Sequence, residues 1–117
     1  MAGAVEDLVA RFLAAQVPRP EWTHLAHLTV GAWHVSRYGL DEAITRLRVG
    51  IRRLNDSNGV ANTATAGYHE SITRAYAVLL DAFLRTFPPE TPLAAQVNAL
   101  VNSGLARRDV LLTFYRQ

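Results

Sequence analysis

Apolar residues recur every three or four positions along most of this chain, in segments that proline or glycine separates. This spacing puts them on one face of an α-helix, and no stretch shows the alternation typical of a half-buried strand. The first such segment covers residues 5–16 and ends before Pro18 and Pro20. Half of the 117 residues are hydrophobic, enough to bury one core. The pattern therefore predicts a single domain over residues 1–117, an all-α compact bundle of five or six helices.

Capping residues set the expected bounds of the second and third helices. Thr23 is suited to cap the second helix, and Gly39 is suited to end it. Asp41 is suited to cap the third. Residues 55–67 lack any period and contain an Asn-Gly turn signal, so a long connection is expected there.

Two further helices and a short last one are expected in the second half of the chain. The fourth covers residues 68–87 and stops at a pair of prolines. The fifth is capped by Thr91, has Pro92 at its first position and runs to Gly104. Residues 107–115 are expected to form one or two last helical turns.

The composition excludes several classes of site. The chain has no cysteine, so disulfides, thiolate zinc sites, iron–sulfur clusters and cysteine nucleophiles are ruled out. It has no lysine, which rules out Schiff-base chemistry. No apolar run approaches the roughly 18 residues that cross a membrane. Glu6 and Asp7 stand where a signal peptide carries positive charge, so we expect a cytoplasmic protein.

The charge balance argues against a nucleic-acid partner. All 12 basic residues are arginine, against 10 acidic residues, and the net charge is +2. Two excess arginines give a high isoelectric point because arginine hardly titrates, while the field at neutral pH stays weak. The one basic cluster lies mostly off the apolar stripe of the third helix, and consists of Arg46, Arg48, Arg52 and Arg53. We interpret it as a solvated face rather than a phosphate-binding one.

The predicted second helix carries most of the residues that could form a binding or catalytic site. Three of the four histidines, His24, His27 and His34, fall on one face of it, with Gly31 between them. His24 and His27 are three residues apart, so their Cβ atoms lie about 5–6 Å apart and both rings can reach one ion. His34 lies about 10 Å further along the axis, too far to share that ion readily, and is expected to bind deeper in the bundle, to orient a partner or to line the pocket.

A catalytic metal site usually takes three protein ligands and keeps a position for water. His69, which follows the long connection, is the candidate third ligand beside His24 and His27. Glu21 and Glu70 are the candidates for a fourth ligand or a general base. The sequence thus predicts a divalent metal, zinc, iron or similar, that activates a water molecule. A His-x-x-His pair has low specificity, and it fits a structural role equally well.

Residues near the predicted site are candidate contacts for a small polar ligand. Asn62, Thr63, Thr65 and Tyr68 belong to the connection or directly follow it, and their side chains can hydrogen-bond such a ligand. Trp22 precedes the second helix and is expected to cover the opening.

Structural roles explain some of the same residues. His34 is interpreted mainly as a core residue bonded to a carbonyl group. Glu70 lies in the first turn of its helix, four residues before Arg74, and an ion pair explains its presence. Glu21 is equally explained as a surface acid, and Trp22 as a packing anchor.

Two segments resemble a family of small, uncharacterised bacterial all-helical proteins. They are E-W-T-H-x-A-H-L at residues 21–28 and N-T-x-T-x-G-Y-H-E-S at residues 62–71. The resemblance covers roughly residues 21–83 and implies that both histidine-bearing segments form one site in a compact helical fold. It implies no reaction. Members of the family often continue beyond a tyrosine-containing terminal helix, whereas this sequence ends at Gln117.

The sequence supports two hypotheses about function. The first is a small helical protein whose histidine-lined pocket binds a divalent metal or a small polar ligand, with metal-assisted hydrolysis as its catalytic form. The second is a noncatalytic interaction module that forms a homodimer. Alanine-rich apolar stripes in residues 4–15 and 92–101 would suit close packing between helices of two subunits.

Overall fold

The computed structural model describes residues 3–60 and 70–103, and these residues form five α-helices, one 3₁₀ turn and no strand. The predicted all-α bundle is therefore confirmed. The elements in chain order are α1 (Ala4–Leu13), η1 (Arg19–Glu21), α2 (His24–Tyr38), α3 (Leu40–Ser57), α4 (Glu70–Leu84) and α5 (Leu93–Val101).

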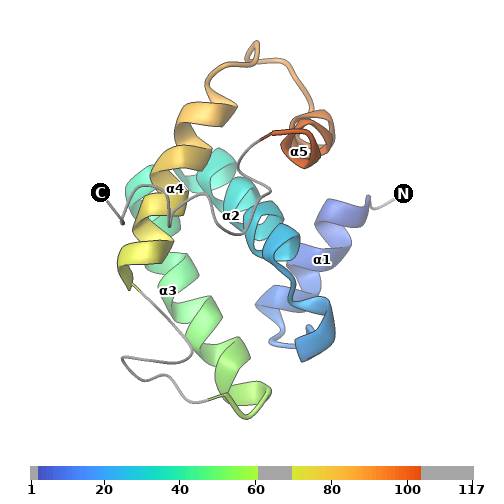
Figure 1. Cartoon of the computed structure of the whole chain (residues 1–117), viewed down its shortest axis with the longest axis vertical. Helices are drawn as coiled ribbons and strands as arrows, with labels where there is room; N and C mark the ends of the chain where they lie inside the picture. The colour runs from blue at the N-terminus through green and yellow to red at the C-terminus, as the bar shows by residue number, and fades with distance from the viewer. Residues whose placement is uncertain (1–2, 61–69, 104–117) are drawn as a thin grey trace.

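Helix α2 lies at the centre of the bundle and contacts each of the four other helices (Figure 1). Its position follows from its sequence, which is apolar on both sides. Leu28 and Val30 point to opposite sides of the helix, yet each is at most 1% exposed. Helices α1 and α5 lie on one side of α2, and α3 and α4 lie on the other (Figure 1).

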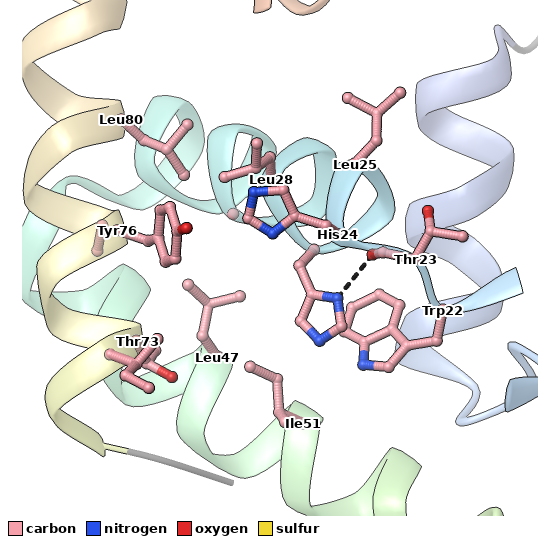
Figure 2. A pocket seen from close by; sticks show the side chains of 14 residues that line it. Trp22, Thr23, His24, Leu25, Leu28, Leu47, Ile51, Thr73, Tyr76 and Leu80 are labelled. Atoms are coloured by element: carbon pink, nitrogen blue, oxygen red, sulfur yellow. Dashed lines mark hydrogen bonds between the residues drawn. The ribbon is translucent and has the colours of Figure 1, made fainter. Parts of the chain in front are cut away.

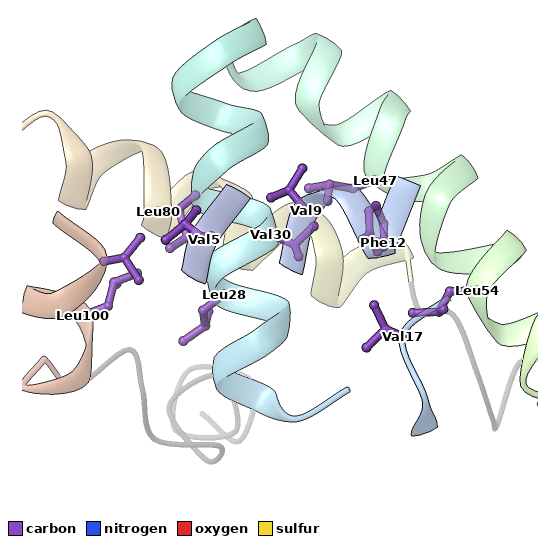
Figure 3. Packing of buried hydrophobic residues seen from close by; sticks show 12 residues of the cluster. Val5, Val9, Phe12, Val17, Leu28, Val30, Leu47, Leu54, Leu80 and Leu100 are labelled. Carbon is purple, nitrogen blue, oxygen red and sulfur yellow. The ribbon is translucent and has the colours of Figure 1, made fainter. Parts of the chain in front are cut away.

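The main core forms around α2 where the apolar stripes of the other helices meet it (Figure 3). Each large side chain buried there stabilises the fold by about 1.5–3 kcal/mol relative to leaving it exposed. The members with the largest side chains are Phe12 from α1, Val17 after it, Leu28 and Val30 from α2, Leu54 from α3, Leu80 from α4 and Leu100 from α5.

Two close approaches to glycine let the helices pack tightly. A Cβ atom on Gly50 would lie 2.5 Å from Cζ of Phe12, so the absence of a side chain admits the aromatic ring against α3. A Cβ atom on Gly31 would lie 2.8 Å from Cδ1 of Leu80. The missing side chain at Gly31 therefore lets α4 approach α2 closely.

The capping residues of α2 and α3 are partly those that the sequence predicts. Thr23 caps α2, since its Oγ1 accepts a hydrogen bond from the backbone N–H of Ala26 at 3.2 Å. Gly39 ends α2 with φ +84°, a conformation that favours glycine. The prediction that Asp41 caps α3 was wrong. Gly39 is also the N-cap of α3, and Asp41 lies inside the first turn, where its charge favours the helix dipole.

The helix ends around the first turn and the long connection differ from the predicted ones. Helix α1 ends at Leu13 rather than at residue 16, because Ala15 adopts a left-handed φ of 56°. Helix α3 continues to Ser57, beyond the expected start of the connection at residue 55. Tertiary hydrogen bonds hold this end: Ser57 Oγ donates to the Ala15 carbonyl at 2.9 Å, and Asn58 Nδ2 donates to the Val17 carbonyl at 3.0 Å.

The observed end of α4 and start of α5 also differ from the predicted ones. Helix α4 ends at Leu84 rather than at residue 87. Pro92, not Thr91, occupies the N-cap position of α5, and no side chain caps that end. The last predicted helical turns, residues 107–115, lie outside the described residues. None of the helices in the described part of the chain is long and apolar enough to cross a membrane.

Candidate ligand-binding pocket

A pocket of about 680 Å³ opens between α2, α3 and α4 (Figure 2). Most of its wall is apolar, and a few polar side chains reach it from the start of α2 and from α4. This combination is typical of small-molecule sites. The lining residues are Trp22, Thr23, His24, Leu25, His27, Leu28 and Gly31 before and in α2, Leu47 and Ile51 in α3, and Ile72, Thr73, Tyr76, Ala77 and Leu80 in α4.

His24 begins α2 and meets α4 across the pocket. Its half-buried ring lies edge-on to the ring of Tyr76, with centroids 5.2 Å apart and planes inclined at 63° (Figure 2). Such an edge-to-face contact stabilises the pair beyond its area burial. The contact fixes the imidazole at the pocket wall, since it joins two separate helices.

His27 has a defined ring orientation. Its Nδ1 lies 2.7 Å from the backbone carbonyl oxygen of Thr23, drawn as a dashed line in Figure 2. A carbonyl oxygen only accepts, so the neutral ring carries its proton on Nδ1 and presents Nε2 as an acceptor or metal ligand. The ring centroid of Trp22 lies 4.0 Å from that of His27 and 5.4 Å from that of Phe12. Trp22 thus lines the pocket and also packs on the core, whereas its role as a cover over the opening stays a prediction.

His34 does not line this pocket. It is 1% exposed, and its Nδ1–H donates to the carbonyl of Val30 at 2.8 Å. Its ring packs edge-on against two aromatic rings, with centroid distances of 5.7 Å to Phe12 of α1 and 5.0 Å to Trp33. Burial lowers the pKa of His34, because a charged imidazolium would lose its hydration. These contacts agree with the core interpretation, and His34 is not among the residues that line this pocket.

The two candidate general bases are engaged in ion pairs and do not line the pocket. The carboxylate oxygens of Glu70 accept from Nε and Nη2 of Arg48, each at 2.7 Å, and one accepts from Nε of Arg74 at 2.6 Å. The predicted pair of Glu70 with Arg74 is therefore confirmed. Glu21 accepts from Nη1 of Arg11 at 2.9 Å. These contacts join α3 to α4 and α1 to η1, and they give both acids a structural explanation.

The metal prediction depends on residues that the structure does not describe. His69 and the candidate ligand contacts Asn62, Thr63, Thr65 and Tyr68 all lie outside the described residues. Within residues 3–60 and 70–103, no group of three or more His, Asp or Glu side chains is arranged to hold a metal ion. The described residues therefore supply two imidazoles on one helix, and His24 and His27 alone make an incomplete site.

The pocket residues from α3 and α4 were not predicted to be part of a binding site. Thr73 and Tyr76 are three residues apart on α4, so they share a face, and this spacing was the available signal. Leu47 and Ile51 belong to the apolar stripe of α3, where a pocket wall and a core position look the same in sequence.

The arginine cluster of α3 does not form one surface. Arg46 donates to Glu42 at 2.8 Å, and its guanidinium carbon lies 3.9 Å from the ring centroid of Tyr38. Arg48 instead joins Glu70 of α4. Arg46 and Arg48 therefore meet different neighbours, on α2 and α4 respectively.

Comparison with known proteins gives no assignment: no family model, curated protein or solved structure matches the chain. The resemblance of residues 21–28 and 62–71 to a bacterial family stays a prediction.

Proposed function

We propose that this protein binds a small, mainly apolar organic molecule in the pocket between α2, α3 and α4, with the polar group of the ligand on His24 and His27. The observation that carries the proposal is the pocket's composition. Its volume of about 680 Å³ is within the range of small-molecule sites, and a few polar side chains from α2 and α4 interrupt a mainly apolar wall.

The imidazoles suit recognition of a polar group. Nε2 of His27 is an acceptor in the neutral ring, because Nδ1 donates to Thr23. The edge contact with Tyr76 orients the ring of His24 before a ligand arrives. Groups held in place beforehand lose little conformational entropy on binding, which favours affinity.

Binding is better supported than hydrolysis. A hydrolase of the predicted kind needs a general base within hydrogen-bond reach of the reacting water. Glu21 and Glu70 are both held by arginines outside the pocket lining. The pocket's own polar side chains are His24, His27, Thr23, Thr73, Tyr76 and the indole of Trp22.

Binding can be tested with the fluorescent probe 1-anilinonaphthalene-8-sulfonate, whose apolar rings suit the pocket wall and whose anilino N–H can donate to an imidazole nitrogen. Thr73→Phe places a ring in the pocket from the half-buried wall of α4. Val78→Phe adds the same ring on α4 at an exposed position outside the pocket. We expect saturable binding that Thr73→Phe weakens at least about tenfold and Val78→Phe leaves unchanged. Equal binding by the two variants would contradict the proposal.

A divalent metal at His24 and His27 is the second proposal, supported by their i,i+3 spacing and their shared place on the pocket wall. Zinc titration by calorimetry tests it against His24→Phe and His27→Phe, which keep an aromatic ring and remove the nitrogen ligands. Loss of zinc binding in both variants supports the site. Unchanged zinc binding in either variant refutes it.

The homodimer hypothesis has lost part of its basis. In α1, Val5, Val9 and Phe12 are buried within the chain, and so are Val97 and Leu100 of α5. The stripes proposed to join two subunits are thus already used in the core. Light scattering at tens of micromolar tests the hypothesis, and a monomer there would exclude it.

A further inference from the structure

A separate groove of about 240 Å³ lies between α1, α2 and α3, away from the pocket described above. It combines exposed apolar side chains with cationic ones. Leu13 and Val49 are 52% and 54% exposed, although both are apolar, and they line it from α1 and α3. Arg46 and Arg53 reach it from α3.

The two arginines differ in charge balance. Arg46 is held by its hydrogen bond to Glu42 and by the ring of Tyr38, so its guanidinium is fixed in place and its charge is balanced. No carboxylate in the described part of the chain forms an ion pair with Arg53. The groove therefore carries about one uncompensated positive charge, which matches a monoanion better than a divalent phosphate.

His34 contributes a polar group to the buried side of this groove. Its Nδ1–H donates to the Val30 carbonyl, so the neutral ring presents Nε2 as an acceptor. Burial and the nearby charge of Arg46 both lower the pKa of His34 and keep the ring neutral at pH 7. Within residues 3–60 and 70–103, the one hydrogen bond of the His34 ring is that of Nδ1, which leaves Nε2 open to a donor from the groove. A nearly buried acceptor of this kind is satisfied by a ligand that donates a proton, such as a hydroxyl group.

We propose that this groove is a second binding site, which takes a small hydroxy-substituted organic acid. The carboxylate meets Arg53 and Arg46, since guanidinium groups match carboxylates in charge and geometry. The apolar body lies against Leu13 and Val49. The hydroxyl donates to Nε2 of His34 and distinguishes this ligand from the unsubstituted acid.

Three aromatic probes separate the parts of the proposal by NMR titration of ¹⁵N-labelled protein. They are 4-hydroxybenzoate, benzoate and the neutral benzamide. We expect 4-hydroxybenzoate to bind tightest, benzoate more weakly and benzamide at least about tenfold more weakly than benzoate. The Nε2 resonance of His34 should shift with 4-hydroxybenzoate. Equal affinity for benzoate and benzamide overturns the site, and equal affinity for the two acids overturns the role of His34.

Matched variants locate the binding. Arg53→Gln should weaken 4-hydroxybenzoate binding about tenfold or more, whereas Arg52→Gln removes the same charge one residue away, outside the groove lining. Val49→Glu places a negative charge at the exposed rim and should abolish binding. Thr73→Phe, which fills the other pocket, should leave this titration unchanged. Equal effects of Arg53→Gln and Arg52→Gln, or loss of binding in Thr73→Phe, refute the proposal.

Discussion

The contact between Gly50 and Phe12 makes a quantitative prediction about packing. In a helix interior, glycine to alanine normally stabilises a protein by about 1 kcal/mol. Here the new Cβ atom would lie 2.5 Å from Cζ and 2.6 Å from Cε2 of Phe12, closer than any real contact. The ring cannot move away easily, because it is 2% exposed and contacts the rings of Trp22 and His34.

The steric term therefore outweighs the helix propensity of alanine. Overpacking a well-filled core costs about 1–3 kcal/mol. Taking about 2 kcal/mol for this rigid contact, Gly50→Ala should lower the free energy of unfolding by about 1 kcal/mol net. In a Phe12→Leu background the ring edge is gone, and the same substitution should then stabilise by up to about 1 kcal/mol.

Urea unfolding followed by circular dichroism measures all four proteins of this double-mutant cycle. The coupling energy between the two positions is expected to be about 2 kcal/mol. The reasoning is refuted if Gly50→Ala stabilises the protein with Phe12 present. It is equally refuted if the effect of Gly50→Ala is the same in both backgrounds, since the clash would then not be its cause.

Three further predictions concern single side chains. The pKa of His34 is lower in the folded protein than its unfolded value near 6.5, so the unfolded chain takes up a proton first as the pH falls. The free energy of unfolding should therefore decrease below about pH 6.5, by up to about 1.4 kcal/mol per pH unit. Urea unfolding at a series of pH values measures this decrease, and His34→Phe should lack it. Glu70→Gln should destabilise by about 1 kcal/mol at low salt and less at 1 M salt, because its pair with Arg48 is partly exposed; an effect independent of salt would contradict this. Thr23→Ala should cost about 1 kcal/mol in the same assay by removing the cap on Ala26, and Thr23→Ser should recover most of it.

The sequence alone determined the helical class and the cap at Thr23. Each of these depends on interactions within a few residues, such as the 3.6-residue period and the hydrogen bond from Ala26 to Thr23. The pairing of Glu70 with Arg74 is local in the same way, since the two residues are neighbours on any helix. For the same reason His24 and His27 could be placed together.

Tertiary structure decided which helix each face meets. His34 shares a face with His27 in sequence, yet it packs on Phe12 in α1, while His24 meets Tyr76 in α4. Arg48 was interpreted as part of a solvated face and instead joins Glu70, 22 residues away. The points at which two helices cross depend on how side chains from separate helices interlock in the core. No short stretch of sequence contains that information. The pocket and the groove both follow from it, because their walls come from three different helices.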